Sequence, residues 1–225
     1  MPNVDVIKVF CDQSGVCGNL LGVVTRGSEV AESDRQAVAK RLGYSETVFI
    51  DDLELGQVRI FSPANELPFA GHPLVGTAWL ISRITGHMPH TLHPPAGAVP
   101  CWRVGDQVWI RGLLKDTPPW WHEQLSSPAY IDALEGPPAR TQSATQLWAW
   151  ENEGEGHVRA RTYGSMFGIP EDEACGSASM RLAAALGRRL VIRHGNGSVI
   201  FAQPGPPGSA EVGGFVVRED TARNI

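Results

Sequence analysis

Two segments of this sequence repeat one another, and the repeat constrains the fold more than any other feature. The first is RIFSPANELPFAGHPLVGTA (59–78), and the second, nearly half the chain away, is RTYGSMFGIPEDEACGSASMRLA (161–183). Each has an arginine, an aromatic residue, a polar loop with an acidic residue, and then a glycine that opens a run of small residues typical of a helix. Similarity at a fixed separation indicates internal duplication. We therefore predict two similar lobes, each a curved sheet around one buried helix.

Local sequence patterns predict the remaining elements. Short runs rich in β-branched and aromatic residues are typical of strands. They predict strands at 4–10, 20–25, 46–50, 57–61, 97–104, 107–112, 146–150, 157–163, 197–202 and 211–217. A helix is expected over 33–43, where Ser33 and Gln36 form a capping-box pattern. The two helices of the repeat are expected to start near His72 and near Gly176.

The stretch 115–140 interrupts this regular order. It is rich in proline and tryptophan, which predicts an irregular connection with a short helix near Tyr130–Leu134. We therefore predict an N-terminal lobe of residues 1–112 and a C-terminal lobe of residues 113–225, with a terminal strand that can cross over between them. Residues 218–225 are expected to form a loose tail.

Composition limits the classes of partner. The chain is 42% hydrophobic and 19% charged, which is enough apolar material for a packed core. Its net charge is −5 and it has no basic stripe, so a nucleic-acid partner is not expected. No apolar run approaches the ~20 residues that span a bilayer, and the N-terminus lacks a signal-peptide pattern, so no membrane partner is expected. The four cysteines lack paired spacing, so we expect a cytoplasmic protein with reduced thiols and neither a zinc site nor a disulfide framework.

Two further patterns are not expected to form a site. His87, His90 and His93 lie on a predicted loop, where they do not converge on a metal ion, so no metal is expected. Trp120 and Trp121 are expected to pack locally or to form a lobe or subunit contact. The chain has no Walker or Rossmann glycine signature, so no nucleotide cofactor is expected.

The two helix starts of the repeat have the chemistry of an anion site. The first N–H groups of a helix have no partner within the helix and carry a partial positive charge, so they bind anions. Glycine at that position lets a ligand approach the backbone closely. If the two lobes face each other, both helix starts open into one cleft that would hold a small carboxylate. His72, Asp172, Cys175 and Ser177 would then be the chemical groups on its walls.

Four segments spread over most of the chain carry a family resemblance. They are GNLLGVV (18–24), SETVFI (45–50), the first repeat segment (59–78) and GIPEDEACGSASMRLA (168–183). These segments resemble the phenazine-biosynthesis isomerase-like (PhzF-like) family, which is related to diaminopimelate epimerase and proline racemase. The resemblance implies an α+β fold of two pseudo-symmetric lobes, each a mostly antiparallel barrel-like sheet around a central helix. It also implies proton transfer in the cleft between the lobes without a cofactor, and a homodimer.

The resemblance also assigns residues. The key acid/base glutamate of the family matches Glu46, and the histidine after the first glycine matches His72. The aspartate before the second helix matches Asp172, and the serine after its glycine matches Ser177. The chain departs from the family at Glu173 and Cys175, where the family has proline and threonine.

The cysteine pattern differs from that of the related epimerases and racemases, in which a cysteine precedes the glycine at each helix start. Cys175 stands at the second position, but Ala70 stands at the first, which disfavours a symmetric racemase with two thiols. A helix N-terminus favours the thiolate, so we expect it to lower the pKa of Cys175. The other interpretation, with equal weight, is that Cys175 is a small buried residue in place of threonine. The sequence does not decide whether the thiol reacts.

Moving a proton on or off carbon needs a base near the carbon and a way to stabilise the resulting charge. Burial in an apolar cleft would raise the pKa of Glu46 toward the useful range. His72 would hydrogen-bond the substrate or relay a proton. Asp172 would orient His72 or a substrate amine or hydroxyl. The residues expected to bind substrate are Asn19, Gly71, Gly176 and Ser177.

We therefore predict a cofactor-independent isomerase or epimerase-like enzyme that acts on a small carboxylate, with Glu46 as the acid/base. The substrate class is an amino acid, a hydroxy acid or a cyclic diene acid, and the sequence does not name it, because fold does not fix function. One alternative is a racemase or dehydratase that uses Cys175 alone. The other alternative is a protein that binds a small acid in the same cleft without turnover.

Overall fold

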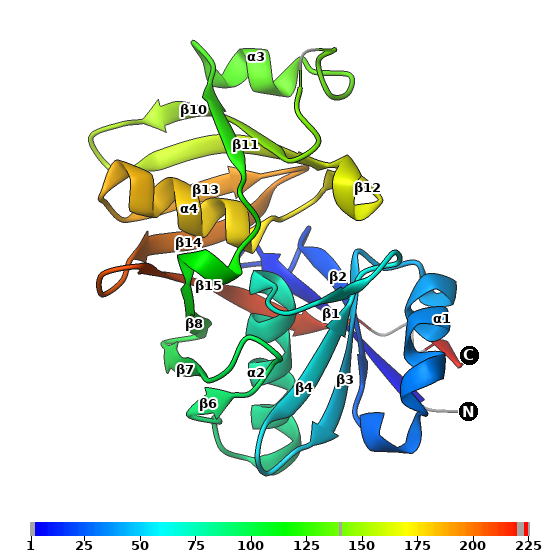
Figure 1. The fold of residues 1–225 in the computed structure, drawn as a ribbon. Helices are drawn as coiled ribbons and strands as arrows, with labels where there is room; N and C mark the ends of the chain where they lie inside the picture. Colours follow the sequence, from blue (N-terminus) through cyan, green and yellow to red (C-terminus); the bar gives the residue numbers. More distant parts are fainter. Residues whose placement is uncertain (1–2, 140, 220–222, 225) are drawn as a thin grey trace.

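The computed structural model describes residues 3–139, 141–219 and 223–224. The chain forms two lobes, one above the other in Figure 1, and a continuous 16-stranded sheet runs through both of them. The first half contains β1 (Asn3–Cys11), β2 (Asn19–Val24), α1 (Glu32–Leu42), β3 (Glu46–Asp52), β4 (Gln57–Phe61), β5 (Glu66–Leu67), α2 (Gly71–Thr85), β6 (Thr91–Leu92), β7 (Val99–Val104) and β8 (Gln107–Leu113). The second half contains β9 (Trp121–Gln124), α3 (Pro128–Asp132), β10 (Thr145–Asn152), β11 (His157–Gly164), β12 (Ile169–Asp172), α4 (Gly176–Leu186), β13 (Leu190–His194), β14 (Ser198–Pro204), β15 (Ser209–Arg218) and β16 (Arg223–Asn224).

The lower lobe wraps a sheet around α2. Its strands follow the order β5-β4-β3-β2-β1-β15, and β8 and β7 continue from β15. All of these pairs are antiparallel except β2 with β3. The helix is apolar and most of its residues are buried, because the sheet covers it on several sides. Burial of this helix forms the core of the lobe.

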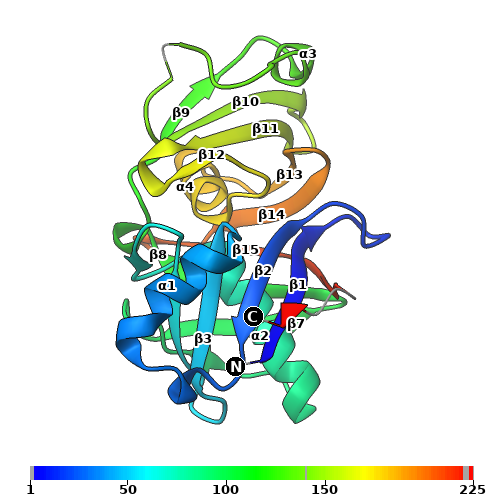
Figure 2. The ribbon, with the colours of Figure 1, turned by 90° about the vertical axis from the view of Figure 1, so that its right-hand side faces the viewer.

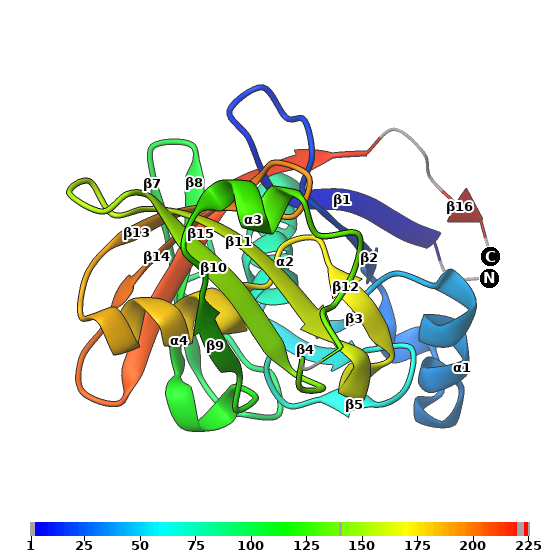
Figure 3. The same cartoon turned by 90° about the horizontal axis from the view of Figure 1, so that it is seen from above.

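The upper lobe repeats this plan around α4. Its strands follow the order β15-β14-β13-β11-β10-β9, and the view from above shows α4 lying across them (Figure 3). The pairs β11–β13 and β9–β10 are parallel, and the others on this path are antiparallel. The small α3 lies on the outer side of β10 and β11 (Figure 2). The α+β fold of two lobes, each with a central helix, is therefore confirmed.

One strand belongs to both lobes. The first part of β15 pairs with β14 in the upper lobe, and its last part pairs with β1 in the lower lobe. Its first part, from Ser209 to Gly214, also pairs with β8. The two lobes therefore share hydrogen bonds through one strand, which fixes how their helices face each other. The boundary at 112/113 stays a prediction.

The arginine and the acidic residue of each repeat segment form an ion pair in the structure. In the lower lobe Arg59 on β4 forms a two-pronged ion pair with Glu66 on β5, with Nη2 2.7 Å from Oε2. In the upper lobe Arg161 on β11 pairs in the same way with Glu171 on β12, at 2.6 and 2.7 Å. Such bidentate pairs fix both orientation and distance. Each pair therefore holds the loop that leads into the central helix of its lobe.

Three local expectations differ from the structure. The helix α1 has no side-chain cap: the Ser33 hydroxyl bonds the Asp34 carboxylate, and the Gln36 amide donates to the carbonyl of Ser62. The predicted capping box is therefore wrong, because α1 begins at Glu32, so Ser33 lies within the first turn and not at the cap, and Gln36 bonds outside the helix. The helix expected near Tyr130–Leu134 begins two residues earlier as α3. The predicted tail lies partly outside the described residues, and its described end pairs with β1 as β16.

Candidate active site

The starts of α2 and α4 meet at the junction of the lobes. A Cβ atom on Gly71 would lie 3.0 Å from the Cα of Gly176, and one on Gly176 would lie 3.1 Å from the Cα of Gly71. Real Cβ contacts are rarely this short, so only glycine allows this approach at both positions. No side chain of the described residues caps either helix, so the N–H groups of both first turns remain available. The two helix starts meet as the repeat predicts.

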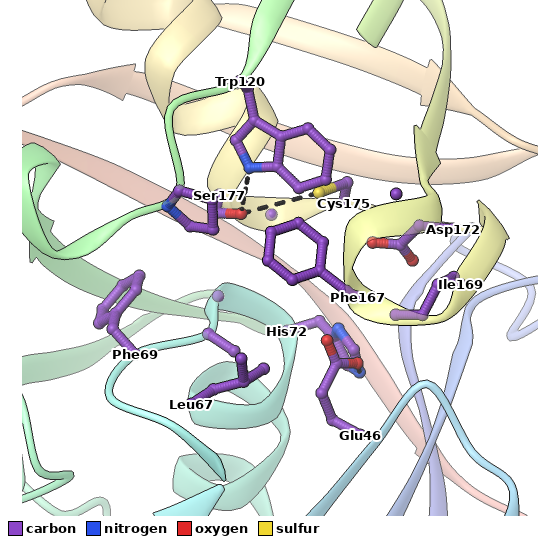
Figure 4. A pocket seen from close by; sticks show the side chains of 15 residues that line it. Glu46, Leu67, Phe69, His72, Trp120, Phe167, Ile169, Asp172, Cys175 and Ser177 are labelled. Carbon is purple, nitrogen blue, oxygen red and sulfur yellow. Dashed lines mark hydrogen bonds and ion pairs between the residues drawn. The ribbon is translucent and has the colours of Figure 1, made fainter. Parts of the chain in front are cut away.

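A cavity of about 40 Å³ lies at this junction (Figure 4). Glu46 at the start of β3 and His72 in the first turn of α2 line it from the lower lobe. Asp172, Cys175 and Ser177 line it from the upper lobe, on the opposite side in Figure 4. The remaining lining residues are Leu67, Phe69, Ala70, Gly71, Pro118, Trp120, Gly164, Phe167, Ile169 and Gly176.

Glu46 and His72 form a buried contact. Their side chains are almost fully buried, and Glu46 Oε2 lies 3.3 Å from His72 Nε2. Neither atom has a hydrogen-bond partner among the described residues. Buried polar atoms are nearly always paired in native proteins, so unpaired atoms at a cavity need an explanation. Both atoms are placed to interact with a ligand in the cavity.

The contact between Glu46 and His72 is not an ion pair, because both side chains are mostly neutral near neutral pH. Burial raises the pKa of Glu46 to about 8, and the nearby charge of Asp172 adds to the rise. Burial lowers the pKa of His72 to about 3. Near neutral pH most of the Glu46 carboxyl therefore carries its proton and the imidazole is neutral. The carboxyl is then able both to lose and to regain a proton close to neutral pH.

Asp172 is held by the lower lobe. The amide Nδ2 of Asn19 donates to Asp172 Oδ1 at 2.6 Å, and the Ser45 hydroxyl donates to Asn19 Oδ1 at 3.1 Å. Burial raises the pKa of Asp172 to about 6, against the lowering effect of its hydrogen bonds from Cys175, Ala174 and Asn19. Within the described residues Asp172 is hydrogen-bonded by Asn19 and not by His72, which was one of its two expected partners. Asn19, expected to bind substrate, is not among the residues that line the cavity, and its bond to Asp172 links the two lobes beside it.

The thiol of Cys175 differs from expectation. Its pKa is raised well above the ordinary value, first by burial and then by the charge of Asp172. The expected lowering by the helix N-terminus is therefore wrong, because loss of solvation outweighs the helix dipole here. The thiol remains protonated near neutral pH, 3.7 Å from the hydroxyl of Ser177.

Trp120 was expected to pack locally or to form a lobe or subunit contact, and in the structure it also lines the cavity. Its indole Nε1 donates a hydrogen bond to Ser177 Oγ at 2.8 Å, and its ring lies against Phe167 with centroids 5.5 Å apart. The residue lies in the connection 115–140, whose path the sequence does not predict. Phe69 could have been found, because it stands two residues before Gly71 in the repeat. Phe167 and Trp120 have no such signal.

The described ranges contain neither a metal-binding cluster nor a helix suited to a membrane. No group of three or more His, Cys, Asp or Glu side chains converges there as a metal site would. No helix in those ranges is long and apolar enough to cross a bilayer.

Comparison with known proteins adds a family and a fold. Residues 7–136 match the family model described as phenazine biosynthesis-like protein. Trans-2,3-dihydro-3-hydroxyanthranilate isomerase from Pseudomonas aeruginosa is 29% identical over 230 aligned residues, covering 84% of this chain and 81% of that protein. A protein from the same organism, described as a predicted epimerase, has a similar structure, with a TM-score of 0.77 at 22% identity over 100% of this chain and 99% of that one. A hydroxyproline epimerase from Agrobacterium vitis, with trans-4-hydroxy-L-proline bound, has a TM-score of 0.60 at 11% identity and covers 97% of this chain and 90% of that one.

Proposed function

This chain belongs to the phenazine biosynthesis-like protein family, and on that premise we propose that it is a cofactor-independent isomerase that moves a proton at carbon in a small carboxylate. One observation carries the proposal most. Glu46 and His72 present unpaired, buried atoms to one cavity, and the pKa of Glu46 is about 8. A strongly perturbed carboxyl in a cleft is a common property of catalytic acids and bases. A relative with 29% identity is named an isomerase, which agrees with this chemistry.

The proposed reaction uses both lobes. The substrate carboxylate binds at the two helix starts, where Gly71 and Gly176 allow close approach and the free N–H groups attract negative charge. The carboxylate form of Glu46 takes a proton from a carbon atom, and the electron pair moves into the conjugated carboxylate. The N–H groups stabilise the charge that develops on the carboxylate oxygens. Protonated Glu46 then returns the proton to another carbon, so the atoms balance without any cofactor.

The other polar side chains have positioning roles in this proposal. His72 stays neutral, so its Nε2 atom interacts with the substrate or with the proton of Glu46 without adding a charge. Asp172 orients a hydroxyl or amine of the substrate from the upper lobe. The cytoplasmic location expected from the sequence and the homodimer implied by the family resemblance belong to the proposal as well, and light scattering of the purified protein tests for the mass of a dimer.

The experiment is a screen of small carboxylic acids, first by thermal shift and then by carbon–deuterium exchange in heavy water followed by NMR. We expect exchange at carbon with an acid that raises the melting temperature. Glu46→Gln should abolish the exchange and keep the thermal shift, because the amide cannot carry the proton. Cys175→Ser should keep both.

Two outcomes would support other functions. Loss of exchange in Cys175→Ser with retention in Glu46→Gln would support a racemase or dehydratase that uses Cys175, whose sulfur lines the same cavity. Binding of an acid by the wild type with no exchange at any carbon would support a protein that binds without turnover. Either result contradicts the proposal.

A further inference from the structure

Trp120 lines the cavity, although it lies in a connecting segment and not in a strand of either lobe. It follows the prolines of the connection between β8 and β9, and its half-buried indole reaches the cavity beside Phe167. β11 ends in Gly164, where a Cβ would lie 3.2 Å from the Phe167 ring and 3.4 Å from the Trp120 ring. The absence of a side chain at this position leaves the space in which both rings pack. The two aromatic rings therefore form a fitted wall.

The indole also determines what Ser177 offers a ligand. An indole N–H donates and cannot accept, so Ser177 Oγ is the acceptor in the 2.8 Å hydrogen bond. The hydroxyl proton of Ser177 must then point elsewhere, either to the sulfur of Cys175 at 3.7 Å or to a ligand. A carboxylate oxygen is a much stronger acceptor than a thiol. Trp120 thus makes Ser177 a donor toward an anionic ligand.

The same ring limits the size of the ligand. At about 40 Å³ the cavity is smaller than one aromatic ring, so benzoate enters only if a wall moves slightly, and 1-naphthoate enters only if it moves further. The walls at Gly71 and Gly176 are backbone in mutual contact and have no side chain to move. Of the side chains that line the cavity, Trp120 is the largest. An acid that contains a ring therefore fits only if the side chain of Trp120 moves aside.

We propose that Trp120 is the specificity-determining residue of this site: it selects a carboxylate through Ser177 and limits the size of the acid. The inference rests on the proposed function, because it takes the ligand to be a carboxylate. It goes further in naming the residue that separates small acids from larger ones.

The test is calorimetric binding of benzoate and 1-naphthoate to the wild type, Trp120→Ala, Trp120→Phe and the control Trp121→Ala. Trp121 is the exposed neighbour and does not line the cavity. In Trp120→Ala we expect the affinity for naphthoate relative to benzoate to rise about tenfold or more, because the largest wall is removed. Trp120→Phe keeps a ring without the N–H, so benzoate should bind about threefold to tenfold more weakly. Trp121→Ala should leave both affinities within about twofold of the wild type.

An affinity ratio in Trp120→Ala within about twofold of the wild type, or no binding of either acid to that variant, overturns the inference. If Trp120→Ala does not fold, Trp120→Leu removes most of the ring and is held to the same criterion. Carbon exchange separates the two proposals. A shifted ratio without exchange in heavy water leaves the role of Trp120 standing and removes the isomerase, whereas exchange with an unchanged ratio does the opposite.

Discussion

Glu46→Gln is expected to stabilise the protein in a way that grows with pH. Burial raises the pKa of the carboxyl from 4.5 to about 8, and its Oε2 atom has no hydrogen-bond partner among the described residues. Glutamine has nearly the same shape and no proton to lose. In the wild type, keeping residue 46 protonated lowers the free energy of unfolding at every pH at which the unfolded chain would lose that proton. The glutamine variant has no proton to lose, so this loss of stability is absent.

The sign follows from counting protons. Between pH 4.5 and about 8 the unfolded chain has lost the proton of residue 46, and the folded protein still holds it. The folded state then binds more protons, so the free energy of unfolding of the wild type falls by ~1.36 kcal/mol for each pH unit. Over the interval from 4.5 to about 8 the loss is about 5 kcal/mol. Any cost of burying the glutamine amide is the same at every pH, so it shifts the curve without changing its slope.

Urea unfolding between about pH 4 and about pH 9 measures this difference. We expect the stability of Glu46→Gln relative to the wild type to rise by several kcal/mol across the range and to level off above about pH 8. Glu54→Gln, at an exposed position, is the matched control and should follow the wild type throughout. A difference that stays constant within about 1 kcal/mol, or that falls as pH rises, would show that Glu46 is not held protonated by burial.

Three other predictions follow from the site. The rate of carbon exchange should rise with pH and reach a plateau above about 8, because Glu46 must be ionised to accept the proton; a rate that falls over this range would make the protonated form the active one. Gly71→Ala should lower the free energy of unfolding by ~1–3 kcal/mol in urea and abolish exchange, since its Cβ would press on the facing helix start. Gly136→Ala, at an open position, should do neither, and equal effects of the two changes would contradict the packing argument. Cys175 should resist a thiol reagent in the native protein because its sulfur is buried, while the half-exposed Cys17 reacts, as peptide mass spectrometry would show; equal labelling would contradict the burial that raises the pKa of Cys175.

The sequence predicts most of this fold because the repeat combines several independent signals. An apolar, glycine-opened run predicts a buried helix in each lobe, and α2 and α4 are buried as expected. Duplication implies a pseudo-symmetric arrangement, which brings Gly71 and Gly176 into contact. The pairing of each arginine with the acid of its own loop was present in the pattern but was not inferred, since a spacing does not say which side chains meet.

The site is less accessible to sequence reasoning for two physical reasons. Burial decides the pKa of a group, and burial depends on the whole fold, so the helix dipole alone predicted the wrong direction for Cys175. Side chains from irregular segments are placed by tertiary contacts rather than by periodicity, so Trp120 was assigned a packing role. The roles of Glu46 and His72 stay predictions, although the structure places both on the cavity.

The symmetry of the scaffold contrasts with the asymmetry of its chemistry. A racemase that inverts one carbon needs a base on each face, and two equivalent helix starts would serve that reaction with matched residues. Here the residues before the two glycines are Ala70 and Cys175, and the thiol is protonated near neutral pH. Of the two carboxyls that line the cavity, Glu46 in the lower lobe has an unpaired oxygen, whereas Asp172 on the opposite side accepts hydrogen bonds from Asn19 and Cys175. One unpaired carboxyl beside an anion-binding pair of helices suits a reaction that removes a proton and returns it on the same face at another carbon, which favours isomerisation over racemisation.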